Sequence, residues 1–150
     1  MHFPPVNYLA VLVAGIVIFL LGGLWYSPVL FVKRWLALQG RTEEQMRAQA
    51  ASANMPLMYA SAFICGLVTA WALALILGHI TRDPNMAVNG TGISALHGAM
   101  FGFMCWLGFA ATTSYATALF SGKPRQLWFI DTAYNLVSFM LAGIILAVWR

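Results

Sequence analysis

The chain has 150 residues, the length of one domain, and hydrophobic residues make up 61% of it. Charged residues make up only 8%, against about 25% in soluble domains. So few charges cannot cover a soluble surface, which excludes an ordinary soluble enzyme, a disordered chain and a nucleic-acid-binding protein. The composition predicts an integral membrane protein, in which the net charge of +4 reflects basic loops and acidic lipid headgroups.

Four apolar segments are each close to or above the roughly 20 residues that a helix needs to cross a bilayer. They lack the alternation of strands, and only helices or closed barrels satisfy a backbone in lipid. We therefore expect an all-α fold, one domain that is a bundle of four transmembrane helices. The predicted spans are Val6–Leu24, Leu57–Gly78, Ile93–Phe120 and Leu127–Trp149. The third is too long for a straight crossing, so it should tilt or extend into the interface.

Between the first two spans, the sequence predicts a short amphipathic helix at the membrane surface. Ser27-Pro28 is typical of a helix start and Gly40 of a helix end. Apolar residues recur there at helical spacing with basic residues among them, and Lys33, Arg34 and Trp35 are the predicted contacts to lipid headgroups.

A second, more polar helix should follow in the same connection. Thr42-Glu43-Glu44-Gln45 fits a capping box, in which the first and last side chains bond each other's backbone. We expect this helix to end near Ala53. Asn54 and Pro56 then begin the second span.

Loop charges predict the orientation. The connections at residues 25–56 and 121–126 share one side of the membrane and hold six basic residues, whereas the other side holds only Arg82 and Arg150. Because short basic loops stay in the cytoplasm, we expect both termini outside. The six basic residues are Lys33, Arg34, Arg41, Arg47, Lys123 and Arg125.

Small residues recur at helical spacing in the second and third spans. Such residues let helix backbones approach closely in lipid. They predict helix packing, either within the bundle or between copies in an oligomer. The residues are Ala62, Gly66, Ala70, Ala74 and Gly78, with Gly98 and Gly102 in the third span.

Asp131 is the one acidic residue inside a predicted span, and a carboxylate in a bilayer is costly enough to be a functional candidate. Asn135 follows one turn later, and a polar end of the third span should lie on the same side. We expect a structural clasp, in which Asp131 bonds that polar end or pairs with a nearby basic residue. A proton or ion site and a substrate pocket remain alternatives. The candidate residues are Asp131, Tyr134, Asn135, Thr112, Thr113 and Tyr115, and the expected partners also include Ser114, Thr117, Lys123 and Arg125.

No residue pattern predicts a metal, a cofactor or a catalytic group. Cys65 and Cys105 lie in apolar runs without disulfide or zinc spacing. The three histidines, His2, His79 and His97, should lie on the outer side without metal-binding spacing, and His97 should bond a neighbouring helix. A formal glycosylation sequon begins at Asn89.

Two groups of motifs resemble one family. The first is Gly23-Leu24-Trp25-Tyr26-Ser27-Pro28 with Leu30-Phe31, Lys33, Trp35, Gly40 and Thr42-Glu43-Glu44. The second is Trp106-Leu107-Gly108-Phe109, Ala111-Thr112-Thr113, Phe120, Lys123-Pro124-Arg125, Asp131-Thr132-Ala133-Tyr134 and the stretch from Gly143 to Trp149-Arg150. Together they are similar to the domain of unknown function 1761 family. The resemblance implies a small bacterial inner-membrane protein of four helices and brings no activity or catalytic residue.

Three functions follow as hypotheses. The first is a non-enzymatic structural or accessory membrane subunit that packs through its small-residue faces, as a homo-oligomer or in a larger complex. The second is a small oligomeric transporter or channel. The third is a membrane enzyme or binder that acts on a lipid or small amphiphile. Membrane lipids are partners in all three, and no nucleic acid or cofactor is expected.

Overall fold

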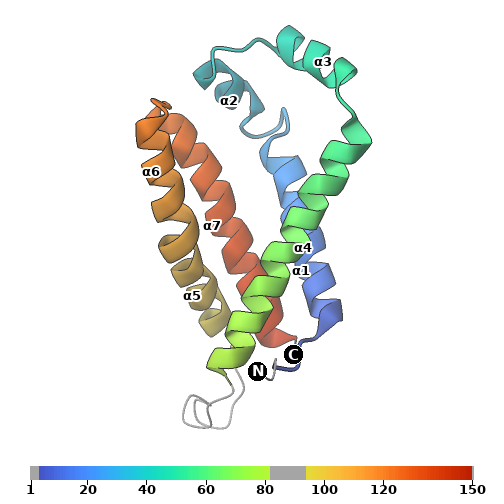
Figure 1. Ribbon diagram of the computed structural model, residues 1–150, viewed down its shortest axis with the longest axis vertical. Coiled ribbons are helices and arrows are strands. Elements are labelled where there is room, and N and C mark those ends of the chain that lie inside the picture. Colours follow the sequence, from blue (N-terminus) through green and yellow to red (C-terminus); the bar gives the residue numbers. More distant parts are fainter. Residues whose placement is uncertain (1–3, 82–93, 150) are drawn as a thin grey trace.

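The computed structural model describes residues 4–81 and 94–149, and within these ranges the chain is helical without strands (Figure 1). The predictions for His2, Arg82, the sequon at Asn89 and Arg150 fall outside the described residues. The α-helices are α1 (Tyr8–Trp25), α2 (Val32–Leu38), α3 (Glu43–Ser52), α4 (Met55–Ile80), α5 (Ala95–Cys105), α6 (Thr112–Phe120) and α7 (Arg125–Val148). A π-helical segment, Trp106–Ala111, joins α5 to α6.

The predicted membrane bundle is confirmed in its helices. Four of them are long and apolar enough to cross a membrane: α1, α4, the continuous helix Ala95–Phe120 and α7. The two chain ends lie at one end of the bundle, here called the terminal end (Figure 1). The opposite end, here called the loop end, carries α2, α3 and the turn between α6 and α7.

The amphipathic helix begins later than predicted. Ser27 does not cap it, because the Ser27 hydroxyl forms a turn instead: it donates to the Leu24 carbonyl (2.7 Å) and accepts from the Val29 amide (3.3 Å). Helix α2 therefore starts at Val32. Its end agrees with the sequence, since Gly40 adopts the left-handed backbone (φ 66°) that glycine tolerates best.

One side of α2 packs on the bundle. Val32 and Leu36 are buried within the protein, whereas Lys33 and Arg34 are exposed. The following helix α3 starts as predicted, because Thr42 and Gln45 form the reciprocal bonds of a capping box. Val32 and Leu36 thus face the bundle, and the basic side of α2 faces outward.

Glycines set the closest helix crossings. At the crossing of α5 and α7, a Cβ atom on Gly98 would collide with the Gly143 carbonyl, and one on Gly102 with the Phe139 carbonyl. At the crossing of α1 and α4, a Cβ on Gly66 would lie 3.3 Å from the Gly15 carbonyl oxygen. These distances allow only glycine at the α5–α7 crossing without a backbone shift.

The small residues that were predicted to pack along the second span lie on α4 and are only partly covered. Gly66 and Ala70 are buried, Ala74 and Gly78 are half-buried, and Ala62 is exposed.

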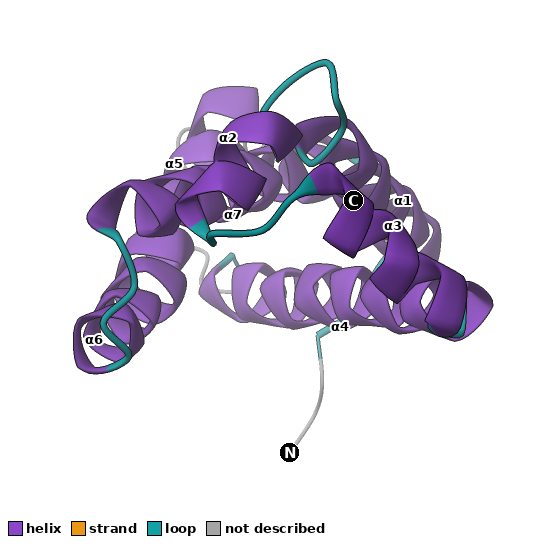
Figure 2. Cartoon of the chain, turned by 90° about the horizontal axis from the view of Figure 1, so that it is seen from above, coloured by secondary structure: helices purple, strands orange, loops and turns teal. Residues whose placement is uncertain are grey.

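The bundle opens toward the loop end. Helix α4 passes close to α5 near the terminal end, but α4 and α6 stand on different sides of the molecule at the loop end (Figures 1 and 2). Helix α6 packs on α7. This divergence leaves the α6–α7 surface near Asp131 accessible.

Candidate functional site

Asp131 lies one to two turns into α7 and joins three elements. Its Oδ1 atom accepts one hydrogen bond from the Tyr26 hydroxyl (2.9 Å) and a second from the Trp35 indole nitrogen (3.0 Å). Tyr26 follows α1, and Trp35 belongs to α2. The carboxylate therefore clasps α7 to the end of α1 and to the surface helix.

The expected donors to this carboxylate were wrong. Thr112 donates to the Gly108 carbonyl (2.9 Å), and Thr113 donates to the Phe109 carbonyl. A hydroxyl in lipid is satisfied most directly by the carbonyl one turn earlier in its own helix. Ser114 and Thr117 do the same, and no described Lys or Arg forms an ion pair with Asp131.

Aromatic side chains surround the clasp. The Trp25 indole donates to the Ile130 carbonyl (3.1 Å), and the Tyr134 hydroxyl donates to the Ile18 carbonyl (3.2 Å). The Tyr26 ring meets the rings of Trp35 and Tyr134 edge to face, at centroid distances of 5.5 and 5.7 Å. Tyr134 is thus a neighbour of Asp131 that fastens α7 to α1.

Sequence reasoning missed these aromatic donors. The segment Trp25-Tyr26 and the residue Trp35 were present as motifs, and Trp and Tyr carry a polar group that needs a partner when buried. That signal identifies side chains that need a hydrogen-bond acceptor. It does not reveal that the acceptor lies about a hundred residues later in the chain.

Tyr26 is held in its neutral form. Burial raises the pKa of the Tyr26 phenol well above its ordinary value, and the charge of Asp131 and the hydrogen bond to it raise that pKa further. The phenol therefore remains a hydrogen-bond donor throughout the physiological pH range.

A pocket of about 320 Å³ lies beside the clasp, between α6 and α7. This volume is at the lower end of the range of small-molecule sites, about 300–1,000 Å³. The pocket, here called the α6–α7 pocket, is lined by Thr113, Ser114, Thr117, Ala118, Lys123, Trp128, Asp131, Thr132 and Asn135.

Two indoles hold the walls of this pocket together. The Trp128 indole on α7 donates to the Ser114 hydroxyl on α6 (3.0 Å). The Trp106 indole donates to the backbone carbonyl of Thr132 (3.0 Å). The Tyr115 ring packs against Trp128, at a centroid distance of 4.9 Å, and lies outside the lining.

Several polar atoms in the pocket are unused within the described part of the chain. Thr132 is only 5% exposed, and its hydroxyl has no hydrogen-bond partner there. The second carboxylate oxygen of Asp131 accepts no hydrogen bond from a described residue. The side-chain amide of Asn135 also forms no hydrogen bond with a described residue. The site thus holds a hydroxyl, a carboxylate oxygen and an amide that have no hydrogen-bond partner among the described residues.

A larger pocket at the terminal end, of about 530 Å³, is chemically different. Its lining is mostly apolar, and its polar side chains serve the ends of helices. Asn7 accepts from the amides of Leu9 and Ala10, and Thr81 donates to the Leu77 carbonyl. This pocket has no group comparable to Thr132.

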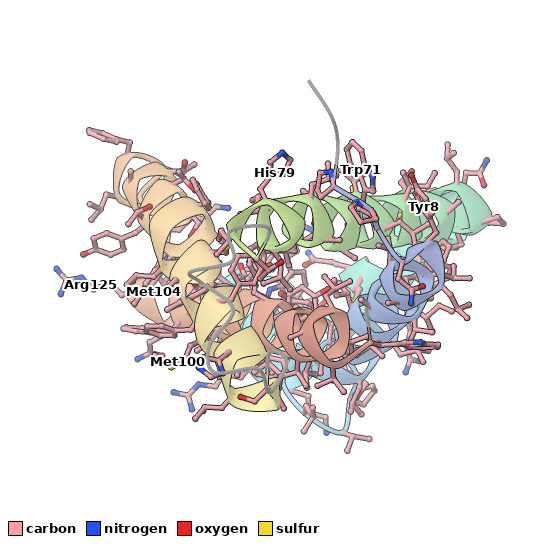
Figure 3. All side chains as sticks on the ribbon, turned by 90° about the horizontal axis from the view of Figure 1, so that it is seen from below. Tyr8, Trp71, His79, Met100, Met104 and Arg125 are labelled. Carbon is pink, nitrogen blue, oxygen red and sulfur yellow. The ribbon has the colours of Figure 1, made fainter. Side chains whose placement is uncertain are left out.

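The described histidines make local contacts. The Nδ1 atom of His79 lies 2.8 Å from the Leu75 carbonyl oxygen, and the side chain points away from the bundle (Figure 3). His97 was expected to bond a neighbouring helix, and this was wrong: its Nδ1 lies 2.7 Å from the hydroxyl of Ser94, which caps the same helix. No group of three or more metal-binding side chains occurs among residues 4–81 and 94–149.

Comparisons with known proteins agree with the motifs. A family model described as "Protein of unknown function (DUF1761)" matches residues 9–147, which is nearly the whole chain. No curated protein and no solved structure matches the chain.

Proposed function

The chain belongs to the DUF1761 family of proteins of unknown function, and since membership brings no activity, we propose a function from the site: a non-enzymatic membrane protein that binds an amphiphile in the α6–α7 pocket. The protein would take this ligand from the surrounding membrane. The four apolar helices, which fit a multi-pass membrane protein, provide the setting.

The observation that carries the proposal is the hydroxyl of Thr132. A buried hydroxyl without a partner costs about 1–3 kcal/mol, and Thr132 lies on the wall of a pocket rather than in a closed core. A polar ligand group in the pocket would remove that cost. Trp128 adds an aromatic surface, and Lys123 adds a positive charge.

The chemistry of the lining supports binding more than catalysis. The pocket offers one carboxylate, Asp131, and its lining contains no histidine or cysteine. One oxygen of that carboxylate already accepts two hydrogen bonds, so the group is fixed in place as a clasp. General acid–base or nucleophilic catalysis needs a second partner group within hydrogen-bond distance.

Other functions draw on weaker observations. An accessory subunit or homo-oligomer would need free small-residue faces, but Gly66, Gly98 and Gly102 face helices of the same chain. A transporter would need polar groups along the bundle, and those at the terminal end are engaged in helix ends. An oligomer therefore remains an expectation that rests on exposed residues such as Ala62.

The proposal places the α6–α7 pocket on the cytoplasmic side of a bacterial inner membrane, with both termini outside. Six basic residues lie in the connections of the loop end, and this supports that orientation. In a chain that carries Cys65→Ala and Cys105→Ala, a membrane-impermeant thiol reagent added outside should label Asn89→Cys and miss Gln45→Cys. The opposite labelling pattern would reverse the orientation.

Whether the pocket holds an amphiphile can be tested with a variant in which a larger side chain fills the pocket. Thr117 lines the pocket, whereas Thr112 lies on the same helix outside the lining, and each donates to a carbonyl one turn earlier. Protein extracted in mild detergent should retain lipid that native mass spectrometry detects. Thr117→Trp should remove that lipid, and the matched control Thr112→Trp should keep it. Equal retention in both variants, or water as the sole occupant of the wild-type pocket, would contradict the proposal.

A further inference from the structure

The order of polar groups along the α6–α7 pocket identifies the class of amphiphile. Lys123 precedes α7, so it lies nearest to the membrane surface. Asp131 and Thr132 lie within α7, and Asn135 lies one turn deeper, about 6 Å farther along the axis at 1.5 Å per residue. This order holds whichever side of the membrane the loop end faces.

At the depth of Asp131 and Thr132, the pocket offers hydrogen-bond acceptors. The free oxygen of Asp131 can only accept while the group is ionised, and the Thr132 hydroxyl can accept or donate. An anionic ligand group at this depth would meet the charge of Asp131 and be repelled. A hydroxyl or amine in that position would donate to Asp131 and satisfy Thr132.

The outer part of the pocket favours an anion. The ammonium group of Lys123 has no ion-pair partner among the described residues, in which Arg47 pairs with Glu43. An ammonium group is a strong point charge for phosphate or carboxylate. From Asp131 outward to the membrane surface, the pocket therefore matches a hydrogen-bond donor near Asp131 and an anion near Lys123.

We infer that the α6–α7 pocket binds an amphiphile that carries a free hydroxyl or amine between its acyl part and a terminal phosphate. The inference rests on the proposed function and names its ligand class. Lysophosphatidate has this order, because its free hydroxyl lies between the chain and the phosphate. Phosphatidylethanolamine has the opposite order, with its amine outermost, where it would meet Lys123.

Three probes separate the features of the ligand. Oleoyl lysophosphatidate has both the hydroxyl and the phosphate, dioleoyl phosphatidate lacks the free hydroxyl, and mono-oleoylglycerol lacks the phosphate. The full chain in phosphatidylcholine nanodiscs should bind the first at least about tenfold more tightly than either of the others, which corresponds to about 1.4 kcal/mol. Binding is measured by native mass spectrometry at equal mole fractions.

Three variants assign the two recognition steps. Lys123→Gln should lower lysophosphatidate binding to the level of mono-oleoylglycerol. Arg125→Gln removes the same charge from a neighbouring exposed side chain that projects away from the bundle (Figure 3) and lies outside the pocket lining, so it should leave binding unchanged. Asp131→Asn keeps an acceptor for Tyr26 and Trp35 but replaces the free oxygen with a donor, and it should abolish the preference over phosphatidate.

The outcomes also separate this inference from the proposed function. Equal binding of dioleoyl phosphatidate would overturn the ligand class while leaving an amphiphile-binding protein. Displacement of lysophosphatidate by an equal concentration of soluble glycerol 3-phosphate would assign the pocket to a free phosphoester and overturn the need for a chain. Loss of all binding in the wild type would overturn both.

Discussion

The two ends of the bundle are held together by different forces. Toward the terminal end, α5 and α7 cross so closely that the Gly98 and Gly143 backbones leave no room for a Cβ atom. At the loop end, α7 is fastened by side chains, through Asp131, Tyr26 and Trp35. Backbone contact fills the space between helices, whereas long aromatic side chains bridge it and leave room beside them.

This difference explains why the polar pocket lies where it does. In lipid, helices gain no hydrophobic free energy from meeting each other, so close packing and interhelical hydrogen bonds hold them. The glycine crossing depends on close packing, which leaves no room for a ligand. The clasp depends on interhelical hydrogen bonds. Where the helices diverge, the Thr132 hydroxyl and one oxygen of Asp131 have no hydrogen-bond partner among the described residues. A rigid end thus supports an end that can receive a ligand.

Breaking the glycine crossing should have the largest effect on stability. In Gly98→Leu the new side chain would meet the Gly143 carbonyl and the Cβ atom of Ala147, and backbone must move to relieve the contact. We expect the free energy of unfolding to fall by about 3 kcal/mol or more. Thermal unfolding in detergent, followed by size-exclusion chromatography, measures the loss.

A matched glycine provides the control for that variant. Gly23 lies in α1 with no atom of another part of the chain within 4 Å of an added Cβ. Gly23→Leu should therefore leave stability unchanged or raise it by up to about 1 kcal/mol, through better helix propensity. Equal losses in the two variants would show that the crossing contributes no more than an ordinary helical position.

Breaking the clasp should have the next largest effect. Asp131→Leu leaves the Tyr26 hydroxyl and the Trp35 indole without their acceptor, at about 1–3 kcal/mol for each fully buried donor. Because these groups are only half-buried, we expect about 2 kcal/mol in total. Asp131→Asn keeps one acceptor oxygen and should cost about 1 kcal/mol. A Leu variant as stable as the Asn variant would refute the clasp.

Removing one donor should have a smaller effect still. Trp35→Phe keeps an aromatic ring beside Tyr26 but loses the bond to Asp131, and we expect a loss of about 1 kcal/mol. Trp71→Phe is the control, because Trp71 (labelled in Figure 3) is 43% exposed, and its indole makes no hydrogen bond to a described residue. Chemical unfolding monitored by circular dichroism distinguishes the two. Similar losses would assign the effect to ring size.

The same comparison shows how much the sequence could predict. The spans follow from the length and apolarity of their segments, and the capping box at Thr42 and the turn at Gly40 follow from local chemistry. Asp131 could be singled out because a carboxylate in lipid is costly. These properties belong to one segment at a time.

The partners of Asp131 could not be predicted in the same way. Thr112 and Thr113 are closer in sequence, but each has a carbonyl in its own helix that satisfies it. The side chains of Tyr26 and Trp35 reach the carboxylate because α2 folds back onto α7, and this depends on the path of the whole connection. The start of α2 was missed for a related reason, since Ser27 can cap a helix or close a turn with equal chemistry.

The smallest expected effect is on the ionisation of Tyr26. Burial and the neighbouring Asp131 raise the pKa of this phenol in the folded protein above its value in the unfolded chain, about 10. The bond to Asp131 therefore contributes fully below that unfolded value, and its contribution is lost only as the pH rises through the higher folded value.

The difference in phenolate absorbance between wild type and Tyr26→Phe isolates this one residue. In folded protein the difference should show no ionisation near pH 10, whereas in denatured protein it should show one there. Asp131→Asn removes the charge but not the burial, so it should lower the pKa of Tyr26 only part of the way. A phenol that ionises alike in folded and denatured protein would mean that Tyr26 faces water, and the loop end would then lack the clasp that distinguishes it from the glycine crossing.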